Sequence, residues 1–337
     1  MALLAVGVVA VLSWDVTQPY GSEYAMLAAR LHTWNTAPGL EETADPLLPG
    51  GGEVTVEVEA AAVTHLDLTV MTGTFAHRPA LPFTPGTAGV GTVVEGGAAL
   101  LGRRVLVRGG GIGLERDGTW AERVAVPAGA LREVPQDADA ALAATCYSPV
   151  TTAWSAVEAV GRVEKGERVL VTGAAGAVGS LCVQLAARAG AHVVAVVRDE
   201  GAAGAVPDAA HEVLVRPTCD EAAGKGEADV LLDTVGGNTV PDFLQAMRPG
   251  GRAVLIGYVA GTTLRVDLPA LMARDIALLP VNMVRRHVPA EVFDRLLGDL
   301  TGGRLALRTT ALPFERIAEA VETRRKGGGR GTLAVLM

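Results

Sequence analysis

Hydrophobic and polar residues alternate one by one in Glu53–Glu59, which reads E-V-T-V-E-V-E. This period of two predicts a β-strand with one buried face. Further short hydrophobic segments follow, among them Arg104–Arg108 and Glu122–Val126, and glycine or proline residues separate them. Many short strands at this spacing predict a barrel-like β domain in the first part of the chain.

Near Ala140 the pattern changes to helices and strands in alternation. The predicted strands are Arg168–Thr172, His192–Val197, Asp229–Asp233 and Arg252–Gly257, and the first predicted helix between them is Val178–Ala189. Such alternation predicts right-handed crossovers and a parallel sheet. After about residue 284 we expect helices at Ala290–Leu300 and Phe314–Arg325, and a last strand at Thr332–Leu336.

The first residues form a separate hydrophobic segment, Ala2–Leu12. Its 11 residues are too few to span a bilayer, which takes about 20. The first basic residue is Arg30, so the cationic start of a secretory signal is missing. We therefore expect an N-terminal extension over residues 1–25, a domain that begins near Met26, and no membrane partner.

Charge and cysteine content narrow the partners and the compartment. The chain has 29 basic and 37 acidic residues, a net charge of −8, which argues against nucleic acid as a partner. Cys146, Cys182 and Cys219 form no CxxC pair, which favours a reducing cytoplasm and excludes a four-cysteine zinc site. The excess of arginine, alanine and glycine indicates a bacterial origin with high-GC coding.

The most informative motif is the glycine-rich segment Gly173–Gly179, which reads G-A-A-G-A-V-G. With 42 glycines in 337 residues the spacing alone is weak, but here it lies between a hydrophobic strand and a helix, with a second strand after it. In a βαβ unit such glycines allow a tight turn and a close approach of the backbone to a pyrophosphate. We therefore expect a dinucleotide site.

The end of the second predicted strand indicates which dinucleotide binds. An NAD enzyme usually has an acidic residue there for the ribose 2′-hydroxyl, whereas here Arg198 follows Val197, and Arg216 ends the next strand. Two guanidinium groups favour a 2′-phosphate. We predict NADPH as the cofactor.

Together these segments resemble the medium-chain dehydrogenase/reductase superfamily, in its zinc-independent quinone oxidoreductase-like branch. The resemblance covers Met26 to the C-terminus and rests on Gly52-Glu53-Val54, Ala61–Asp67, Pro85–Gly89, Gly118–Glu122, Thr152-Ala153-Trp154, Gly166–Gly179, Asp233–Gly237 and Gly250-Gly251-Arg252.

The resemblance implies a fold of class α/β plus β. A GroES-like β-barrel catalytic domain would be built from both chain ends (26–149 and 285–337), with an inserted Rossmann domain, a doubly wound parallel sheet, at 150–284. It also implies a homodimer. The expected cofactor contacts are Thr152, Gly173, Ala174, Gly176, Ala177, Val178, Gly179, Arg198, Arg216, Thr234, Val235 and Gly257.

The positions of metal ligands in zinc-dependent relatives carry other residues here. Gly86-Thr87-Ala88 stands where those relatives have Gly-His-Glu, and Thr64 stands where they have a cysteine. Hydroxyl and methyl groups do not hold Zn²⁺ against water. We expect no metal, and hence reduction of an acceptor that is already electrophilic.

Four residues remain as candidate proton donors: Tyr147, Thr64, His65 and Asp67. Each has a structural alternative, because Tyr147 could be part of the core, His65 a scaffold histidine and Asp67 a helix cap. The branch commonly has Asn at the position of Thr64, and some members have tyrosines where this chain has Thr69 and Phe75, which weakens the case for a quinone acceptor.

Three functions stay open at this point. The first is an NADPH-dependent reductase of a small electrophilic acceptor, either a quinone or an α,β-unsaturated carbonyl compound. The second is an enoyl-thioester reductase of fatty-acid or polyketide synthesis, with Arg285, Arg286 and His287 at a basic entrance for phosphopantetheine. The third is an NADPH-binding structural protein that has lost catalysis.

Overall fold

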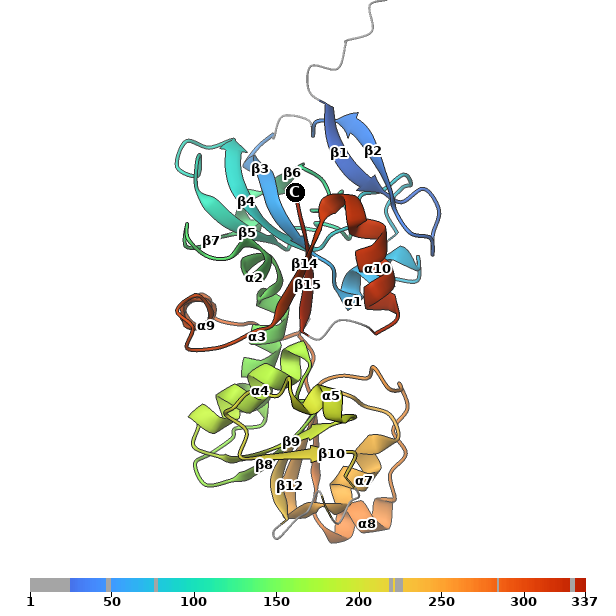
Figure 1. Cartoon of the computed structure of the whole chain (residues 1–337), viewed down its shortest axis with the longest axis vertical. Coiled ribbons are helices and arrows are strands. Elements are labelled where there is room, and N and C mark those ends of the chain that lie inside the picture. Colours follow the sequence, from blue (N-terminus) through green and yellow to red (C-terminus); the bar gives the residue numbers. More distant parts are fainter. Residues whose placement is uncertain are drawn as a thin grey trace, which may run out of the picture.

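The chain folds into two lobes, one built on a mixed sheet and the other on a parallel sheet (Figure 1). The computed structural model describes residues 25–46, 50–75, 78–217, 221, 227–283, 285–327 and 331–337. The hydrophobic segment Ala2–Leu12, Cys219 and residue 284 lie outside the described residues.

The mixed sheet contains the strand that the alternating pattern predicted, β3 (Glu53–Ala62). Its strand order is β14 (Thr309–Pro313), β15 (Thr332–Leu336), β3, β4 (Ala88–Glu95), β5 (Arg104–Arg108) and β7 (Leu131–Glu133), and β6 (Arg123–Pro127) also pairs with β3. Strand β15 pairs antiparallel with β3, with Ala334 opposite Ala62. The prediction that both chain ends build this domain is therefore confirmed.

Smaller elements complete this lobe. They are the antiparallel pair β1 (Ala25–Arg30) and β2 (Gly39–Ala44), helix α1 (His65–Met71), the 3-10 turns η1 (Ala128–Ala130) and η3 (Phe314–Arg316), and helix α10 (Ile317–Arg325). The helix predicted at Phe314–Arg325 thus starts as a 3-10 turn. The pair β1 and β2 had no clear signal in the sequence.

The other lobe has a six-stranded parallel sheet. Its order is β10 (Glu212–Val215), β9 (His192–Val197), β8 (Arg168–Thr172), β11 (Ala228–Asp233), β12 (Met247–Leu255) and β13 (Ala277–Pro280). Counted from β8, this is the order 3-2-1-4-5-6 of dinucleotide-binding folds. The predicted Rossmann domain is confirmed.

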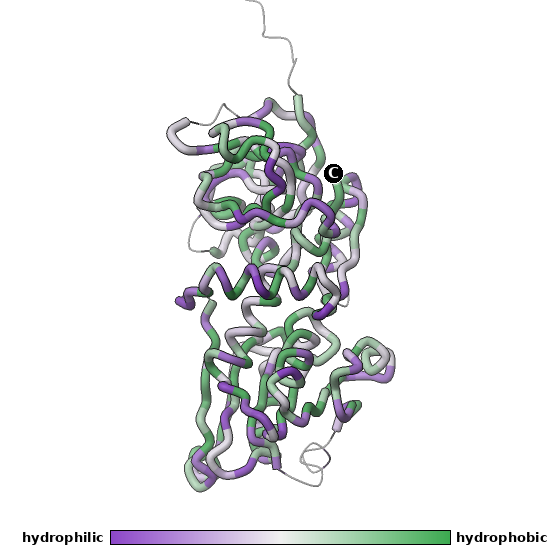
Figure 2. The backbone as a smooth tube through the Cα atoms, turned by 90° about the vertical axis from the view of Figure 1, so that its left-hand side faces the viewer, coloured by the Kyte–Doolittle hydropathy of each residue, from purple (hydrophilic) through white to green (hydrophobic). Residues whose placement is uncertain are grey.

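Helices cover both faces of the parallel sheet, as alternate residues of its strands require. Val169 and Val171 pack on one face with α3 (Tyr147–Trp154), α4 (Ala177–Arg188) and α9 (Ala290–Thr301), whereas Leu170 packs on the other face with α7 (Thr239–Gln245). The other helical segments are α2 (Ala140–Thr145), the π-helical η2 (Ser155–Val160), α5 (Glu200–Ala203) and α8 (Leu268–Ala273). Figure 2 shows hydrophobic segments running through both lobes.

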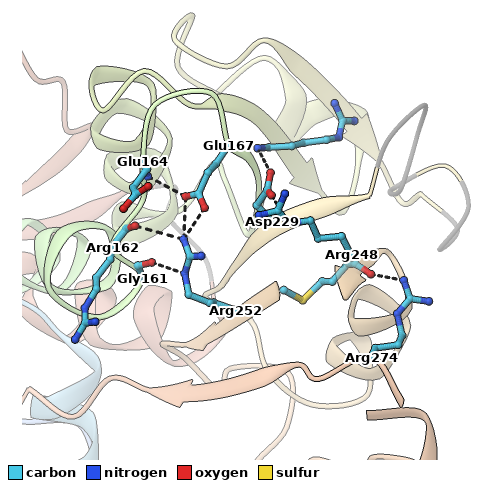
Figure 3. Close-up of polar contacts among 10 residues, drawn as sticks. Gly161, Arg162, Glu164, Glu167, Asp229, Arg248, Arg252 and Arg274 are labelled. Carbon is cyan, nitrogen blue, oxygen red and sulfur yellow. Dashed lines mark hydrogen bonds and ion pairs between the residues drawn. The ribbon is translucent and has the colours of Figure 1, made fainter. Parts of the chain in front are cut away.

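Polar contacts fasten the amino-terminal edge of the parallel sheet (Figure 3). Arg252 donates to both carboxylate oxygens of Glu167, at 2.9 and 2.8 Å, and to the carbonyl of Gly161 at 2.8 Å. The backbone N–H of Arg168 donates to Asp229 at 2.6 Å. This network lies at the opposite end of the strands from the glycine-rich turn, so we assign it to stability.

Two buried cysteines bear on the redox chemistry of the chain, and the helix lengths bear on whether it could cross a membrane. Cys146 and Cys182 are free and buried, and burial raises the pKa of each thiol to about 12. Such thiols are inert at neutral pH. Across the described ranges, every helix is too short or too polar to cross a bilayer.

Candidate active site

Strands β8 and β11 are adjacent in the sheet although two other strands separate them in the chain, and polar groups join their carboxyl ends. The Thr172 hydroxyl donates to Asp233 at 2.6 Å, and the Thr234 hydroxyl donates to the Thr172 carbonyl at 2.8 Å. Burial raises the pKa of Asp233, and hydrogen bonds from Thr172 and Gly236 oppose this rise. In open α/β sheets ligands bind at this switch point, so the edge provides a rigid floor for a site.

The predicted glycine-rich turn lies directly above this floor. A Cβ atom at Gly173, whose φ is +61°, would lie 2.4 Å from the Thr234 hydroxyl, and one at Gly179 would lie 2.2 Å from the Gly173 carbonyl oxygen. Gly176 differs, because it is exposed and its Cβ would meet only the Gly173 carbonyl oxygen, at 3.1 Å. Gly173 and Gly179 therefore keep strand and helix close together, and Gly176 keeps the outer side of the turn open.

The start of α4 fits an anion. Gly176 is the N-cap residue and no side chain caps the helix, so the first N–H groups of this 12-residue helix have no side-chain acceptor. Together with the helix dipole, free N–H groups attract a phosphate. The residues present therefore fit the pyrophosphate of a dinucleotide, and the predicted contacts Gly173, Ala174, Gly176, Ala177, Val178 and Gly179 all belong to this turn and the start of α4.

The remaining predicted cofactor contacts surround the same edge. Thr152 is half-buried in α3, which packs on α4. Val235 follows β11, and a Cβ atom at Gly257 would lie 2.3 Å from the Thr234 carbonyl oxygen. Sequence segments from β8, β11 and β12 thus come together at one edge, although each contact to a cofactor stays a prediction.

The two arginines proposed to read the ribose lie together at neighbouring strand ends. The Arg216 backbone N–H donates to the Val197 carbonyl at 2.9 Å, and its side chain donates to the Arg198 carbonyl. Both side chains are exposed, and Arg198 pairs with Asp199 at 3.1 Å. Asp199 caps α5 by accepting from the Ala202 N–H, so both of its carboxylate oxygens already have a partner within this segment.

On the barrel side, Thr64 and Asp67 form a capping box at the start of α1. The Asp67 carboxylate accepts from the Thr64 hydroxyl at 2.6 Å, the Thr64 N–H at 2.7 Å and the Thr87 N–H at 2.8 Å. Burial raises the pKa of Asp67, opposed by hydrogen bonds from Thr64 and Thr87. Asp67 is therefore a helix cap, which was the structural alternative to its role as a proton donor. The Thr64 hydroxyl is engaged as well, because it donates to Asp67.

His65 and Tyr147 are the remaining candidate proton donors. Desolvation, with a smaller effect of Arg324, lowers the pKa of His65, so its imidazole is mainly neutral at pH 7. The Tyr147 ring packs against Phe293 of α9, with centroids 4.8 Å apart, and its hydroxyl has no hydrogen bond to any described residue. Tyr147 is thus a packing residue, which was its structural alternative. It is also the candidate whose phenol makes no hydrogen bond to a described residue.

Sequence reasoning missed Arg108, at the end of β5. Its guanidinium lies over the Tyr147 ring, 4.8 Å from the centroid, and burial lowers its pKa, opposed by the charges of Tyr147 and Asp67. It remains a cation at neutral pH, because arginine is not deprotonated in proteins. No local signal marked it among the many arginines of the chain.

The threonines at the two former ligand positions have ordinary structural roles here. Thr64 caps α1, and Thr87 is buried beside it with its N–H on Asp67. Among the residues that the structure describes, no three His, Cys, Asp or Glu side chains come together as a metal site.

Comparison with known proteins shows which family has this architecture. A model of the alcohol dehydrogenase GroES-like domain matches residues 50–136, and a model of the zinc-binding dehydrogenase family matches residues 177–298. An acryloyl-coenzyme A reductase of Metallosphaera sedula is 32% identical over 268 residues, which cover 71% of this chain and 79% of that protein. The chain belongs to the medium-chain dehydrogenase/reductase superfamily. It is therefore a nicotinamide-dependent oxidoreductase.

Two further relatives of this medium-chain dehydrogenase/reductase add detail. A quinone oxidoreductase-like protein 2 of Mus musculus is 28% identical, over 84% of this chain and 83% of that protein. The yhdH oxidoreductase from Salmonella enterica, solved in complex with NADP, is 26% identical with a TM-score of 0.75, over 93% of this chain and 100% of that one. These relatives come from an archaeon, an animal and a bacterium, so the bacterial origin of this chain stays a prediction.

Proposed function

We propose that the chain is an NADPH-dependent, zinc-independent reductase that transfers hydride to a quinone or an α,β-unsaturated carbonyl compound. The observation that carries this proposal is the glycine-rich turn at the switch point, with two exposed arginines at the neighbouring strand ends. The names of the quinone oxidoreductase-like and acryloyl-coenzyme A reductase relatives support this class of acceptor.

A bound reduced nicotinamide supplies the hydride, and one proton from solvent completes the two-electron reduction. The Gly173–Gly179 turn and the start of α4 would hold the pyrophosphate, and Arg198 and Arg216 the 2′-phosphate. Tyr147 would donate a hydrogen bond to the acceptor oxygen as negative charge develops there. Thr64 and Asp67 keep the start of α1 in place through their capping box.

An enoyl-thioester reductase remains the second candidate. Arg285, Arg286 and His287 are all exposed in the segment between β13 and α9, as a basic entrance for phosphopantetheine requires. The acryloyl-coenzyme A reductases among the relatives also favour a thioester. A cytoplasmic location and a homodimer belong to the proposal too, and the free buried thiols of Cys146 and Cys182 support a reducing compartment.

Steady-state oxidation of NADPH and NADH, measured with quinones, enones and enoyl thioesters, tests the proposal. We expect turnover with at least one quinone or enone, a lower KM for NADPH, and full activity after prolonged chelation. Faster turnover of thioesters would favour the second candidate. Cofactor binding without turnover of any acceptor would identify a structural protein, and activity lost to a chelator and restored by Zn²⁺ would contradict the metal-free mechanism.

A further inference from the structure

Arg108 is a half-buried cation that has no hydrogen-bond acceptor among the described residues. Its guanidinium has neither a hydrogen bond nor an ion pair with any described residue, and the contact that it makes is with the face of the Tyr147 ring. A guanidinium group that has lost part of its hydration is normally paired, because desolvating an unpaired charge is costly. Arg104, on the same strand, shows the usual arrangement, since it donates to Glu59 at 2.8 Å and to the Ala138 carbonyl at 2.8 Å.

Arg108 faces the junction between the two lobes. Val105 and Val107 belong to the core of the mixed-sheet lobe, whereas Leu106 belongs to the core that β8, α3 and α4 share. Because side chains alternate along a strand, Arg108 continues the face of Leu106. Its contact with Tyr147, the first residue of α3, confirms this direction.

The nearby charges leave an excess of positive charge. Asp67 is a nearby carboxylate, but three donors from Thr64 and Thr87 already bind its oxygens. A second cation, Arg324 on α10, lies close enough to interact electrostatically with both Asp67 and His65, and it donates to the Val63 carbonyl at 3.1 Å. Two guanidinium groups thus share one carboxylate that neither of them binds.

A further polar residue, Thr87, lies beside the Asp67 carboxylate. The Thr87 side chain is buried, and the Thr87 backbone N–H donates to this carboxylate at 2.8 Å. Ala88, the next residue, is opposite Arg108 in the pairing of β4 with β5. An oxyanion beside Arg108 would meet a guanidinium fork, and the Tyr147 hydroxyl next to it makes no hydrogen bond to any described residue.

We infer that Arg108 binds a carboxylate of the acceptor, so that the preferred substrate is an electrophilic enone or quinone that carries a carboxylate near its reacting end. This inference rests on the proposed reductase function and names the substrate class of the same site. Arginine suits the role because its planar fork matches the two oxygens of a carboxylate. The phosphates of a thioester carrier match this position less well, because they lie far from the reacting carbon whereas Arg108 is half-buried at the junction and contacts Tyr147.

The test compares an acid with its uncharged ester. The acceptors are 4-oxopent-2-enoate and its methyl ester, assayed with NADPH at pH 7.5, where the acid is ionised. We expect kcat/KM of wild type to favour the acid at least tenfold, and Arg108→Met to lower the acid-to-ester ratio about tenfold to a hundredfold, the usual effect of a lost charged hydrogen bond. Arg78→Met is the matched control, because Arg78 is an exposed arginine over the Trp34 ring, 5.3 Å from its centroid, and should leave the ratio unchanged.

Two further measurements keep the inference testable if activity or folding fails. Arg108→Lys keeps the charge and should recover part of the ratio if Arg108→Met does not fold. Calorimetric titration with saturated 4-oxopentanoate and its methyl ester, in the presence of NADP⁺, tests binding without turnover. If wild type binds the acid and Arg108→Met does not, the carboxylate site is supported even when no acceptor is reduced. The absence of turnover would then overturn only the proposed function. An acid-to-ester ratio near one in wild type, or an equal loss for both acceptors in Arg108→Met, would overturn the inference.

Discussion

At the scale of single residues, the structure narrows the candidate proton donors by their hydrogen bonds. The Thr64 hydroxyl donates to Asp67, and both oxygens of Asp67 accept backbone N–H groups. His65 is mainly neutral at pH 7 because its pKa is lowered. Tyr147 keeps its phenol available, so it is the residue on which proton donation is best tested.

We therefore expect Tyr147→Phe to lower turnover about 10²- to 10³-fold, the usual cost of losing one donor to a developing oxyanion. The dissociation constant of NADPH should stay nearly the same, because the phenyl ring and its packing on Phe293 are kept. Stopped-flow turnover and fluorescence titration measure the two quantities. Wild-type turnover on the best acceptor would leave proton delivery to His65, Thr64 or water.

Cofactor choice is also decided by single side chains. Arg198→Ala should weaken NADPH binding about tenfold or more and leave NADH binding nearly unchanged, since only NADPH has the 2′-phosphate. The control is Arg132→Ala, an exposed arginine on β7 in the other lobe. Isothermal titration with both cofactors measures the effect, and equal affinities of wild type for NADPH and NADH would contradict the assignment.

The pair Glu212 and Arg168 gives a pH-dependent contribution to stability. Hydrogen bonds from Arg168 and His192 lower the pKa of Glu212 to about 2, below its usual 4.5. A lowered pKa means that the contribution is complete above about pH 4.5 and is lost as the pH falls toward 2. Because these groups are partly exposed, it amounts to about 1 kcal/mol or less.

Glu212→Gln should accordingly lower Tm slightly at pH 7, and the difference from wild type should shrink as the pH falls from 4.5 toward 2. Thermal unfolding followed by circular dichroism across this range measures the difference. A gap in Tm that widens with acidification would show that the ion pair has the opposite effect.

At the scale of elements, the seven-residue glycine-rich turn combines glycines that are needed for folding with one that we expect to be needed for cofactor binding. Gly179→Ala should lower Tm of the apo-protein strongly, because its Cβ would lie 2.2 Å from the Gly173 carbonyl oxygen. Gly176→Val should weaken NADPH binding much more than it lowers Tm, because its side chain would point to the exposed side of the turn. Differential scanning calorimetry and cofactor titration of both variants test this division, and unchanged affinity in a folded Gly176→Val would place the cofactor elsewhere.

Elements with a strong local signal were predictable from the sequence. Strands β5, β8, β9 and β15 have the predicted bounds, because periodicity and turn residues are properties of neighbouring positions. The glycine-rich turn was predictable for the same reason. The arrangement of β14 and β15 beside β3 followed only from the family resemblance, since their pairing joins distant segments.

Other features depend on contacts that no local pattern records. Arg108 ends a strand in the same way as an ordinary surface arginine would. Its lack of an acceptor among the described residues is visible only when Tyr147 and Asp67 are placed around it. The β1 and β2 pair is likewise fixed by distant contacts, such as the bond from the Ala29 N–H to the Trp120 carbonyl. Sequence reasoning therefore located the cofactor edge better than the acceptor site.

At the scale of the whole molecule, the connection between β12 and β13 is unusually hydrophobic for a surface. Tyr258, Val259, Leu268 and Met272 are each at least 60% exposed, and β13 is an edge strand of the parallel sheet. An exposed hydrophobic surface beside a free strand edge favours association with another chain. We place the interface of the proposed homodimer here.

Met272→Glu should convert the dimer to a monomer, because a carboxylate would be buried in the interface. Leu101→Glu is the control, since Leu101 is an exposed hydrophobic residue on a turn of the other lobe. Sedimentation velocity measures both variants at the same concentration. A monomeric wild type, or a Met272→Glu variant that stays dimeric, would contradict this placement.

The pairing of β15 with β3 has a consequence for synthesis on the ribosome. The strands of the parallel sheet all lie between residues 168 and 280, so that sheet can form as soon as this part of the chain has emerged. Strand β3 pairs early with β4 and β6, but its residues Ala60–Ala62 receive their partner β15 only after the parallel sheet has been made. Until then the nascent chain exposes this unpaired end of β3, and unpaired strand edges are a type of surface that is prone to aggregation. A chain that stops before β15 would thus contain a complete parallel sheet attached to an open barrel.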